Sequence, residues 1–165
     1  MEILHVTHEF PPLFDAHCTC LLLGSIPSRA SRQQAFYYAH PQNRFWRVMA
    51  AVFDAPVPGN VTEKRRLMLA HHVALWDALE ECDIRGSSDS TVRNPVPTDI
   101  PWLLTQAPIR RVYTCGAAAD RYYRLFNEAR TGIEACRLPS TSPANCAVSM
   151  EELIAAYRVL KEEAP

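Results

Sequence analysis

Short apolar runs alternate along the chain with stretches of helical periodicity. Four of these runs predict strands, and the first two lack the polar alternation of a half-exposed strand, which predicts burial on both faces. The predicted strands cover residues 18–24, 73–76, 110–116 and, more weakly, 134–138. Each is followed by a turn rich in Gly, Ser, Pro or Asp.

Apolar residues between these strands recur with helical spacing. Phe45 and Met49 share a helix face, for example, and Thr62 is a candidate N-cap. Ser149 and Glu152 form the S-x-x-E pattern of a capping box. The predicted helices cover residues 43–53, 62–71, 101–106, 122–129 and 150–160.

Strands that alternate with helices favour parallel strands with helices on both faces. We therefore expect an α/β protein with one domain over residues 1–165: a three-layer α/β/α sandwich around a central four-stranded parallel sheet. Ligands of such folds bind beyond the carboxyl ends of the strands. Asp83, Arg85 and Asp89 are expected in a loop at that edge.

Composition excludes several classes of protein. The chain is 48% hydrophobic and 21% charged, as is usual for globular domains. No apolar run approaches the roughly 20 residues of a membrane-spanning helix. The first residues lack a signal-peptide pattern, so we expect a cytoplasmic protein. We also expect a monomer without a membrane partner. The six cysteines contain no C-x-x-C pair, which favours free thiols over a metal site, and no cofactor is expected.

The net charge of −1 hides an uneven distribution of charge. Residues 16–53 contain no Asp or Glu but carry Arg29, Arg32, Arg44 and Arg47. Arginine makes up 15 of the 17 basic residues, a ratio that codon usage can largely explain. Codon usage does not explain why acidic residues are absent from particular stretches. The planar guanidinium group of arginine suits phosphate oxygens, so these stretches are candidates for phosphate contacts.

Two turns rich in small residues follow the first and the last predicted strand. The first is G-S-I-P-S at residues 24–28, with Y-Y-A-H-P-Q-N-R-F-W after it at residues 37–46. The second is L-P-S-T-S-P-A-N at residues 138–145. Exposed backbone N–H groups and hydroxyls in such turns suit a phosphate backbone.

These motifs resemble those of the uracil-DNA glycosylase superfamily. The combination of G-S-x-P, Y-Y-A-H-P-x-N-x-F-W, L-W-D and P-S-T-S-P-A-N is closest to the DNA-deoxyinosine (hypoxanthine-DNA) glycosylase branch. The match extends from about Leu21 to Leu160 and includes R-G-S-S-D-S at residues 85–90. The resemblance implies an enzyme that flips a deaminated base of DNA, hypoxanthine first and uracil second, and hydrolyses its N-glycosidic bond.

One departure from the superfamily concerns the first turn. The mismatch-specific branch has a catalytic Asn where this chain has Ile26, which can neither hold water nor polarise a carbonyl. The resemblance offers Asn43 as the catalytic residue in its place. The alternative is that Asn43 only caps the helix after it.

The resemblance also assigns the rest of the site. The base pocket comprises Gly24, Ser25, Ile26, Pro27, Tyr38, His40 and Asp77. The phosphate contacts comprise Ser140, Thr141, Ser142, Arg29 and Arg44. Tyr38 supplies an aromatic face, His40 a hydrogen bond to the leaving base and Asp77 an acceptor for the base edge. Tyr38 could instead pack in the core, with Tyr37 or Phe45 as the aromatic face, and His40 could be a structural histidine. Asp77 could cap a turn, and the hydroxyls of the last loop could belong to a turn that caps the last strand.

Other functions stay open at this level. The chain could be an inactive module that binds damaged DNA, or a uracil or mismatch-specific glycosylase. A small-nucleotide enzyme is disfavoured because no G-x-G-x-x-G or P-loop follows a strand, and a serine hydrolase because G-x-S-x-G is absent. Lys64 and Lys161, the only lysines, fall in predicted helices, which favours a monofunctional glycosylase.

Overall fold

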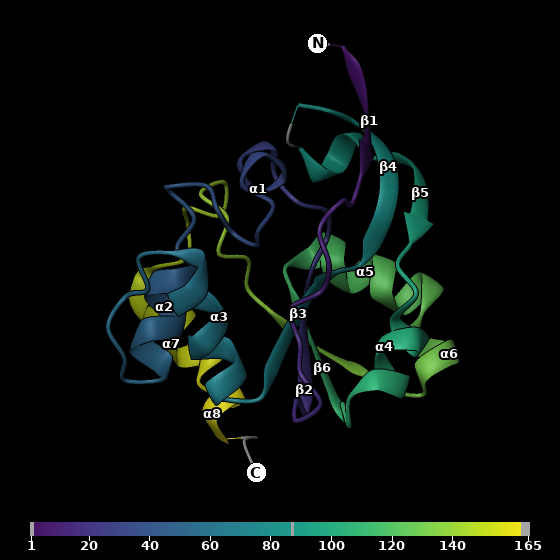
Figure 1. The fold of residues 1–165 in the computed structure, drawn as a ribbon. Coiled ribbons are helices and arrows are strands. Elements are labelled where there is room, and N and C mark those ends of the chain that lie inside the picture. Colours follow the sequence, from purple (N-terminus) through teal and green to yellow (C-terminus); the bar gives the residue numbers. More distant parts are fainter. Residues whose placement is uncertain (1, 87, 163–165) are drawn as a thin grey trace.

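A parallel sheet lies at the centre of the computed structural model, which describes residues 2–86 and 88–162 (Figure 1). Its strands are ordered β3-β2-β6-β7. They are β2 (Cys20–Gly24), β3 (Val73–Asp77), β6 (Arg111–Cys115) and β7 (Ala135–Leu138). All three pairings are parallel, so the four carboxyl ends meet at one edge. The predicted four-stranded parallel sheet is confirmed.

Helices cover both faces of this sheet, which confirms the three-layer sandwich (Figure 1). One face carries α2 (Phe45–Val52), α3 (Val61–Ala70), α7 (Met150–Tyr157) and α8 (Val159–Glu162). The other carries α4 (Ile100–Gln106), α5 (Ala117–Phe126) and α6 (Glu128–Thr131). Along β2, Cys20 and Leu22 pack toward the first layer, and Leu21 and Leu23 toward the second. This alternation divides the core into two halves.

The helix starts follow the capping rules, with one correction. The predicted capping box is confirmed: Glu152 N–H donates to Ser149 Oγ at 3.1 Å, and Ser149 N–H to Glu152 Oε1 at 3.3 Å. The prediction that Thr62 caps α3 is wrong. Asn60 is the cap, and its Oδ1 accepts the Glu63 N–H at 2.8 Å. Asn is at least as good an N-cap as Thr.

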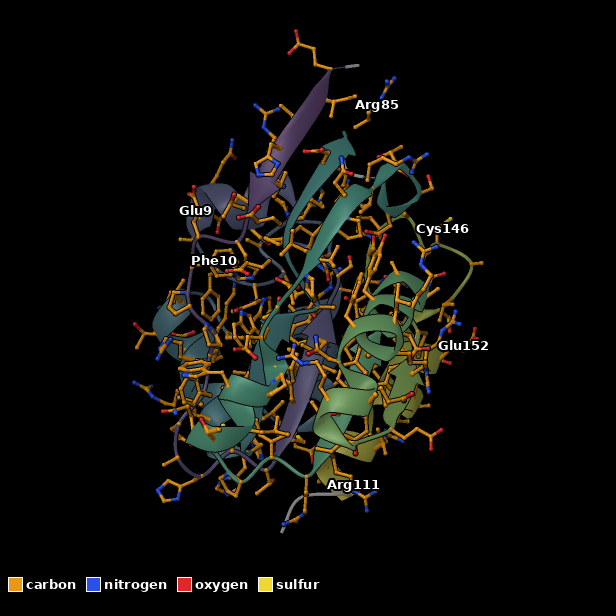
Figure 2. The ribbon with its side chains drawn as sticks, turned by 90° about the vertical axis from the view of Figure 1, so that its right-hand side faces the viewer. Glu9, Phe10, Arg85, Arg111, Cys146 and Glu152 are labelled. Carbon is orange, nitrogen blue, oxygen red and sulfur yellow. The ribbon has the colours of Figure 1, made fainter. Side chains whose placement is uncertain are left out.

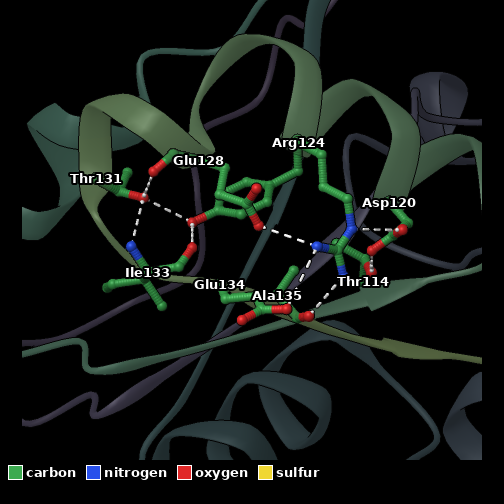
Figure 3. Close-up of polar contacts among 9 residues, drawn as sticks. Thr114, Asp120, Arg124, Glu128, Thr131, Ile133, Glu134 and Ala135 are labelled. Atoms are coloured by element: carbon green, nitrogen blue, oxygen red, sulfur yellow. Dashed lines mark hydrogen bonds and ion pairs between the residues drawn. The ribbon is translucent and has the colours of Figure 1, made fainter.

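A polar network fixes α5 and α6 on the sheet (Figure 3). The Arg124 guanidinium donates to the Ala135 carbonyl of β7 at 2.8 Å, to Asp120 at 2.8 Å and to Glu128 at 3.0 Å. Tyr123 OH donates to the Ile133 carbonyl at 2.6 Å. These bonds tie the helix layer to the last strand.

A second, antiparallel sheet was not predicted. It has the order β1-β4-β5 and comprises β1 (Ile3–Thr7), β4 (Leu79–Arg85) and β5 (Arg93–Pro97). Asp83 and Arg85 therefore lie in a strand, and the expectation that they lie in a loop is wrong; Asp89 is in a short helical turn, η1 (Asp89–Thr91). The helix α1 (Arg29–Gln34) was also missed.

The antiparallel sheet lies beyond the carboxyl ends of β2 and β3 (Figure 1). Arg85, at the end of β4, and Arg111, at the start of β6, lie at opposite ends of the molecule (Figure 2). This sheet therefore borders the edge where the fold class predicts a ligand site.

Candidate nucleic-acid base pocket

A pocket of about 330 Å³ opens at the carboxyl ends of the parallel strands. Its volume lies at the lower end of the range of small-molecule sites, which is about 300–1,000 Å³. Eleven residues that the sequence singled out line it: Gly24, Ser25, Ile26, Pro27, Tyr38, His40, Asn43, Asp77, Ser140, Thr141 and Ser142. The fold thus brings the turns after β2, β3 and β7 together.

The floor of the pocket is built over Gly24. A Cβ atom there would lie 2.4 Å from Asp77 Oδ1 and 3.2 Å from the Tyr38 hydroxyl, so any larger residue would displace the Asp77 carboxylate. The Tyr38 hydroxyl donates to Cys115 Sγ at 3.5 Å. Burial raises the pKa of Cys115 to about 11 and that of Tyr38 well above its usual range, so both groups stay protonated.

Tyr38 is placed for an aromatic contact. Its ring stacks on Phe45 with centroids 3.8 Å apart and an interplanar angle of 13°. One face is therefore covered, and the other face and the edges remain for the pocket. Its backbone is left-handed, with φ of 52°, a conformation that costs free energy for a residue other than Gly.

Asn43 directly precedes α2 and contributes its amide to the pocket. Its Oδ1 accepts the Phe45 N–H at 2.9 Å and the Thr141 hydroxyl at 2.8 Å. Because an N–H donor identifies the oxygen, these bonds fix which way the amide faces. No described residue accepts a hydrogen bond from Nδ2. Asn43 therefore satisfies the N–H of Phe45, the first residue of α2, from the position just before the N-cap residue Arg44, and it also keeps two N–H donors for a ligand.

His40 lies on the exposed side of the pocket. Its Nδ1 accepts the Gln42 N–H at 3.1 Å, so the ring proton of the neutral imidazole is on Nε2. Ile26, by contrast, packs against a small apolar cluster that includes Leu79, Ile84 and Tyr122. The position that is a catalytic Asn in the mismatch branch is thus part of the packing between the turn and the antiparallel sheet.

The loop after β7 is held by its own polar groups. Ser140 Oγ accepts the Ser142 N–H at 3.1 Å, and Ser142 Oγ accepts the Ala144 N–H at 3.2 Å. Each hydroxyl keeps its proton for another acceptor. Thr141 is only 1% exposed, and its hydroxyl bonds to Asn43. Its side chain therefore orients Asn43 in this structure.

The two arginines that the sequence assigned to phosphates do not line the pocket. Arg44 is half-buried, and its guanidinium donates to the Val148 carbonyl at 2.5 Å and to the Asn145 carbonyl at 2.9 Å. It anchors the loop to α2. Arg29 is exposed at the first position of α1, next in the chain to Ser28, which lines the pocket. Arg32, one turn further along α1, lines the pocket and donates to the Pro27 carbonyl at 2.8 Å.

Three other polar residues belong to the site: sequence analysis expected Asp89 at this edge without giving it a role, and it missed Cys115 and His8. Cys115 and Asp89 line the pocket, and Asp89 accepts the Ser25 hydroxyl at 2.9 Å. His8 Nε2 lies 2.8 Å from Asp77 Oδ2. Cys115 ends a predicted strand, a position that could have identified it. No local pattern marks His8, which is 69 residues from Asp77.

The described residues contain neither a cluster of metal ligands nor a helix that could span a membrane. No group of three or more His, Cys, Asp or Glu in the described ranges is arranged to hold a metal ion. Likewise, no helix in the part of the chain that the structure describes is long and apolar enough to cross a membrane. Ser87 of the R-G-S-S-D-S motif lies outside the described residues.

Comparison with known proteins gives matches over most of the chain. The sequence profile of the uracil DNA glycosylase superfamily matches residues 11–161. A hypoxanthine DNA glycosylase from Methanosarcina acetivorans is 32% identical over 142 residues, which cover 85% of this chain and 89% of the relative. Another from Methanosarcina barkeri is 27% identical over 82% of this chain and 86% of the relative.

A solved structure matches the whole architecture. It is the solution NMR structure of a candidate uracil DNA glycosylase from Methanosarcina acetivorans. The TM-score is 0.77 at 29% identity, and the match covers 92% of this chain and 96% of the other.

Proposed function

This chain belongs to the uracil DNA glycosylase superfamily, and from that membership we propose that it is a DNA glycosylase that removes hypoxanthine from DNA. The names of two relatives support DNA as the substrate and an N-glycosidic bond as the bond hydrolysed. The geometry of the pocket supports the finer steps, which are the binding of a flipped base, its excision and the release of an abasic site.

The observation that carries the proposal is the fixed amide of Asn43. Among the described residues that line the pocket, it is the one side-chain amide. Phe45 and Thr141 hold its oxygen, so Nδ2 meets the base or the attacking water without reorientation. A pre-oriented neutral donor stabilises the charge that develops on a leaving base or positions a water molecule.

The neighbouring groups fit a flipped purine. A glycosylase must extrude its target nucleotide, because the sugar bond is unreachable inside the stack. Tyr38 offers a ring face, and Asp77 Oδ1 lies near its hydroxyl over Gly24. An ionised carboxylate accepts the N1–H of hypoxanthine but repels the N1 lone pair of adenine. Asp77 thus favours the deaminated base over the normal one.

The loop after β7 supplies phosphate contacts in this proposal. Ser140 and Ser142 retain hydroxyl protons, and both line the pocket. Phosphate oxygens accept such protons and backbone N–H bonds without sequence preference. In this proposal Arg29 and Arg32 on α1 add positive charge for further phosphate contacts.

A panel of base substrates tests this function. The oligonucleotides carry hypoxanthine, uracil, xanthine or a thymine mismatch, in single and double strands, and alkali reveals the abasic product. We expect hypoxanthine to be released fastest. Release of uracil alone would assign a uracil glycosylase. Ile26 replaces the catalytic Asn of the mismatch branch and packs in an apolar cluster, so an inactive protein is also conceivable in this fold. Tight binding of abasic DNA without release of any base would indicate such a binding module.

A further inference from the structure

A buried histidine pairs with the carboxylate that faces the base. His8 Nε2 lies 2.8 Å from Asp77 Oδ2, and the two side chains are only 3% and 6% exposed. His8 comes directly after β1, so this contact connects the antiparallel sheet to the end of β3. The mechanism proposed above does not use His8.

The position of His8 is fixed from two sides. Its backbone N–H donates to the Glu80 carbonyl at 2.7 Å, next to the start of β4. Its ring lies against Phe10 and Tyr37, with centroids 4.4 and 5.9 Å away. The imidazole therefore has little freedom to move away from Asp77.

Asp77 needs a hydrogen-bond donor because its carboxylate is almost fully buried. A buried carboxylate without a hydrogen-bond donor is costly. Burial raises the pKa values of Tyr37, Tyr38 and Cys115, so these groups stay neutral, and Asp89 nearby is another acid. Within residues 2–86 and 88–162, the side chain that lies within hydrogen-bond distance of the Asp77 carboxylate is His8.

We infer that His8 is the positioning residue for the base-reading carboxylate: its Nε2–H holds Asp77 Oδ2, so that Oδ1 stays over Gly24 as an acceptor for the base edge. His8 itself does not touch the base. This inference rests on the proposed function of the pocket and adds the residue that fixes its selectivity. A histidine is suited to the task because its rigid ring donates one bond in one direction.

Two substitutions separate the hydrogen bond from the packing. In His8→Phe the ring stays against Phe10 and Tyr37, but the donor is lost. In His8→Gln the side-chain amide offers an N–H at a similar reach. Loss of a hydrogen bond to a charged group costs about 1.5–3 kcal/mol, so hypoxanthine release by His8→Phe should fall by roughly tenfold to hundredfold. His8→Gln should stay within about threefold of the wild type.

A base-free ligand shows whether the loss is confined to the reading of the base. DNA with a tetrahydrofuran abasic analogue has no base edge for Asp77 to read, so both variants should bind it as the wild type does. Equal release by the wild type and His8→Phe would overturn the inference. So would parallel losses of hypoxanthine release and abasic-DNA affinity in both variants, which indicate a structural contact.

A spectroscopic measurement tests the hydrogen bond without any activity. Nitrogen-15 NMR of the imidazole in the full chain should show a protonated Nε2 on His8, and its proton signal should move when Asp77→Asn is introduced. An unprotonated Nε2 would overturn the inference even in an active enzyme. If the wild type releases no hypoxanthine but the NMR result holds, the proposed function fails while the His8–Asp77 bond stands.

Discussion

The side-chain amide of Asn43 serves two purposes that one substitution can separate. Asn43→Asp keeps an oxygen that accepts the Phe45 N–H and the Thr141 hydroxyl, but it removes the Nδ2 donor. Asn43→Ala removes both functions. We expect both variants to lose about a hundredfold or more in rate, as enzymes do when such a donor is removed.

The stabilities of these two variants should differ. Asn43→Ala should lower the free energy of unfolding by about 1 kcal/mol, the usual effect of losing a cap, and Asn43→Asp by less. Single-turnover kinetics and urea unfolding measure the two effects. Near wild-type cleavage by Asn43→Asp would show that Asn43 is a cap alone.

The thiol of Cys115 tests the burial of the pocket floor. Its pKa of about 11 leaves only ~0.1% thiolate at pH 8, and the thiolate is the reactive form. Iodoacetamide at pH 8 should therefore modify the exposed Cys136 and Cys146 well before Cys115. The rate at Cys115 should rise about tenfold per pH unit up to pH 10. Peptide mapping by mass spectrometry follows each site, and equal rates at pH 8 would contradict the raised pKa of Cys115.

The contact between His8 and Asp77 shows the limit of sequence reasoning at the residue scale. Strand ends predicted that Gly24, Asp77 and Ser140 would meet, because the carboxyl ends of parallel strands share one edge. His8 reaches that edge only through the antiparallel pairing of β1 with β4. No spacing in the sequence reports a contact of that kind.

At the scale of elements, regular periodicity decided what could be predicted. β2 is a continuous apolar run, β3 and β6 are largely buried, and α7 has a capping box. The missed strands break the expected pattern. β4 carries register shifts on both sides of Glu81, β5 contains Pro95 and Pro97, and β1 buries only Val6. Bulges, prolines and an exposed edge each disturb the alternation with a period of two.

The anchoring of the loop after β7 to α2 gives a prediction at the same scale. Arg44→Met removes the donors to the Val148 and Asn145 carbonyls, which should lower the free energy of unfolding by about 1–3 kcal/mol. It should also weaken abasic-DNA binding, because Ser140 and Ser142 lie on this loop. Arg47→Met, on the exposed side of α2, is the control. Urea unfolding measures the stability, and fluorescence anisotropy measures the DNA affinity. Unchanged stability would show that the loop keeps its conformation without the Arg44 hydrogen bonds.

At the scale of the whole molecule, the positions of the two lysines predict the product. Lys64 Nζ lies 5.4 Å above the Trp46 ring, and Lys161 pairs with Asp54 at 2.9 Å; neither lines the pocket. A lyase step needs an amine nucleophile at the sugar. The product should therefore be an intact strand with an abasic site. Strand scission without alkali, together with a borohydride-trapped adduct, would contradict this.

The distribution of charge over the molecule predicts how salt affects DNA binding. The net charge of −1 gives no general attraction, so the acid-free stretch with Arg29 and Arg32 must supply it locally. Each neutralised phosphate contributes about −0.9 to the slope of log affinity against log salt concentration. With about two such contacts, affinity for abasic DNA should fall roughly twelvefold between 50 and 200 mM salt.

Two exposed arginines on different sides of the molecule make this test specific. Arg29→Ala, beside the pocket, should make the slope less negative by about one, because one phosphate contact is lost. Arg110→Ala, next to the amino end of β6 at the opposite edge of the sheet, should leave the slope unchanged. Fluorescence anisotropy titrations at four salt concentrations give the slopes. Equal slopes for all three proteins would remove Arg29 from the interface, and a flat wild-type curve would show that hydroxyls and backbone groups bind the phosphates without help from charge.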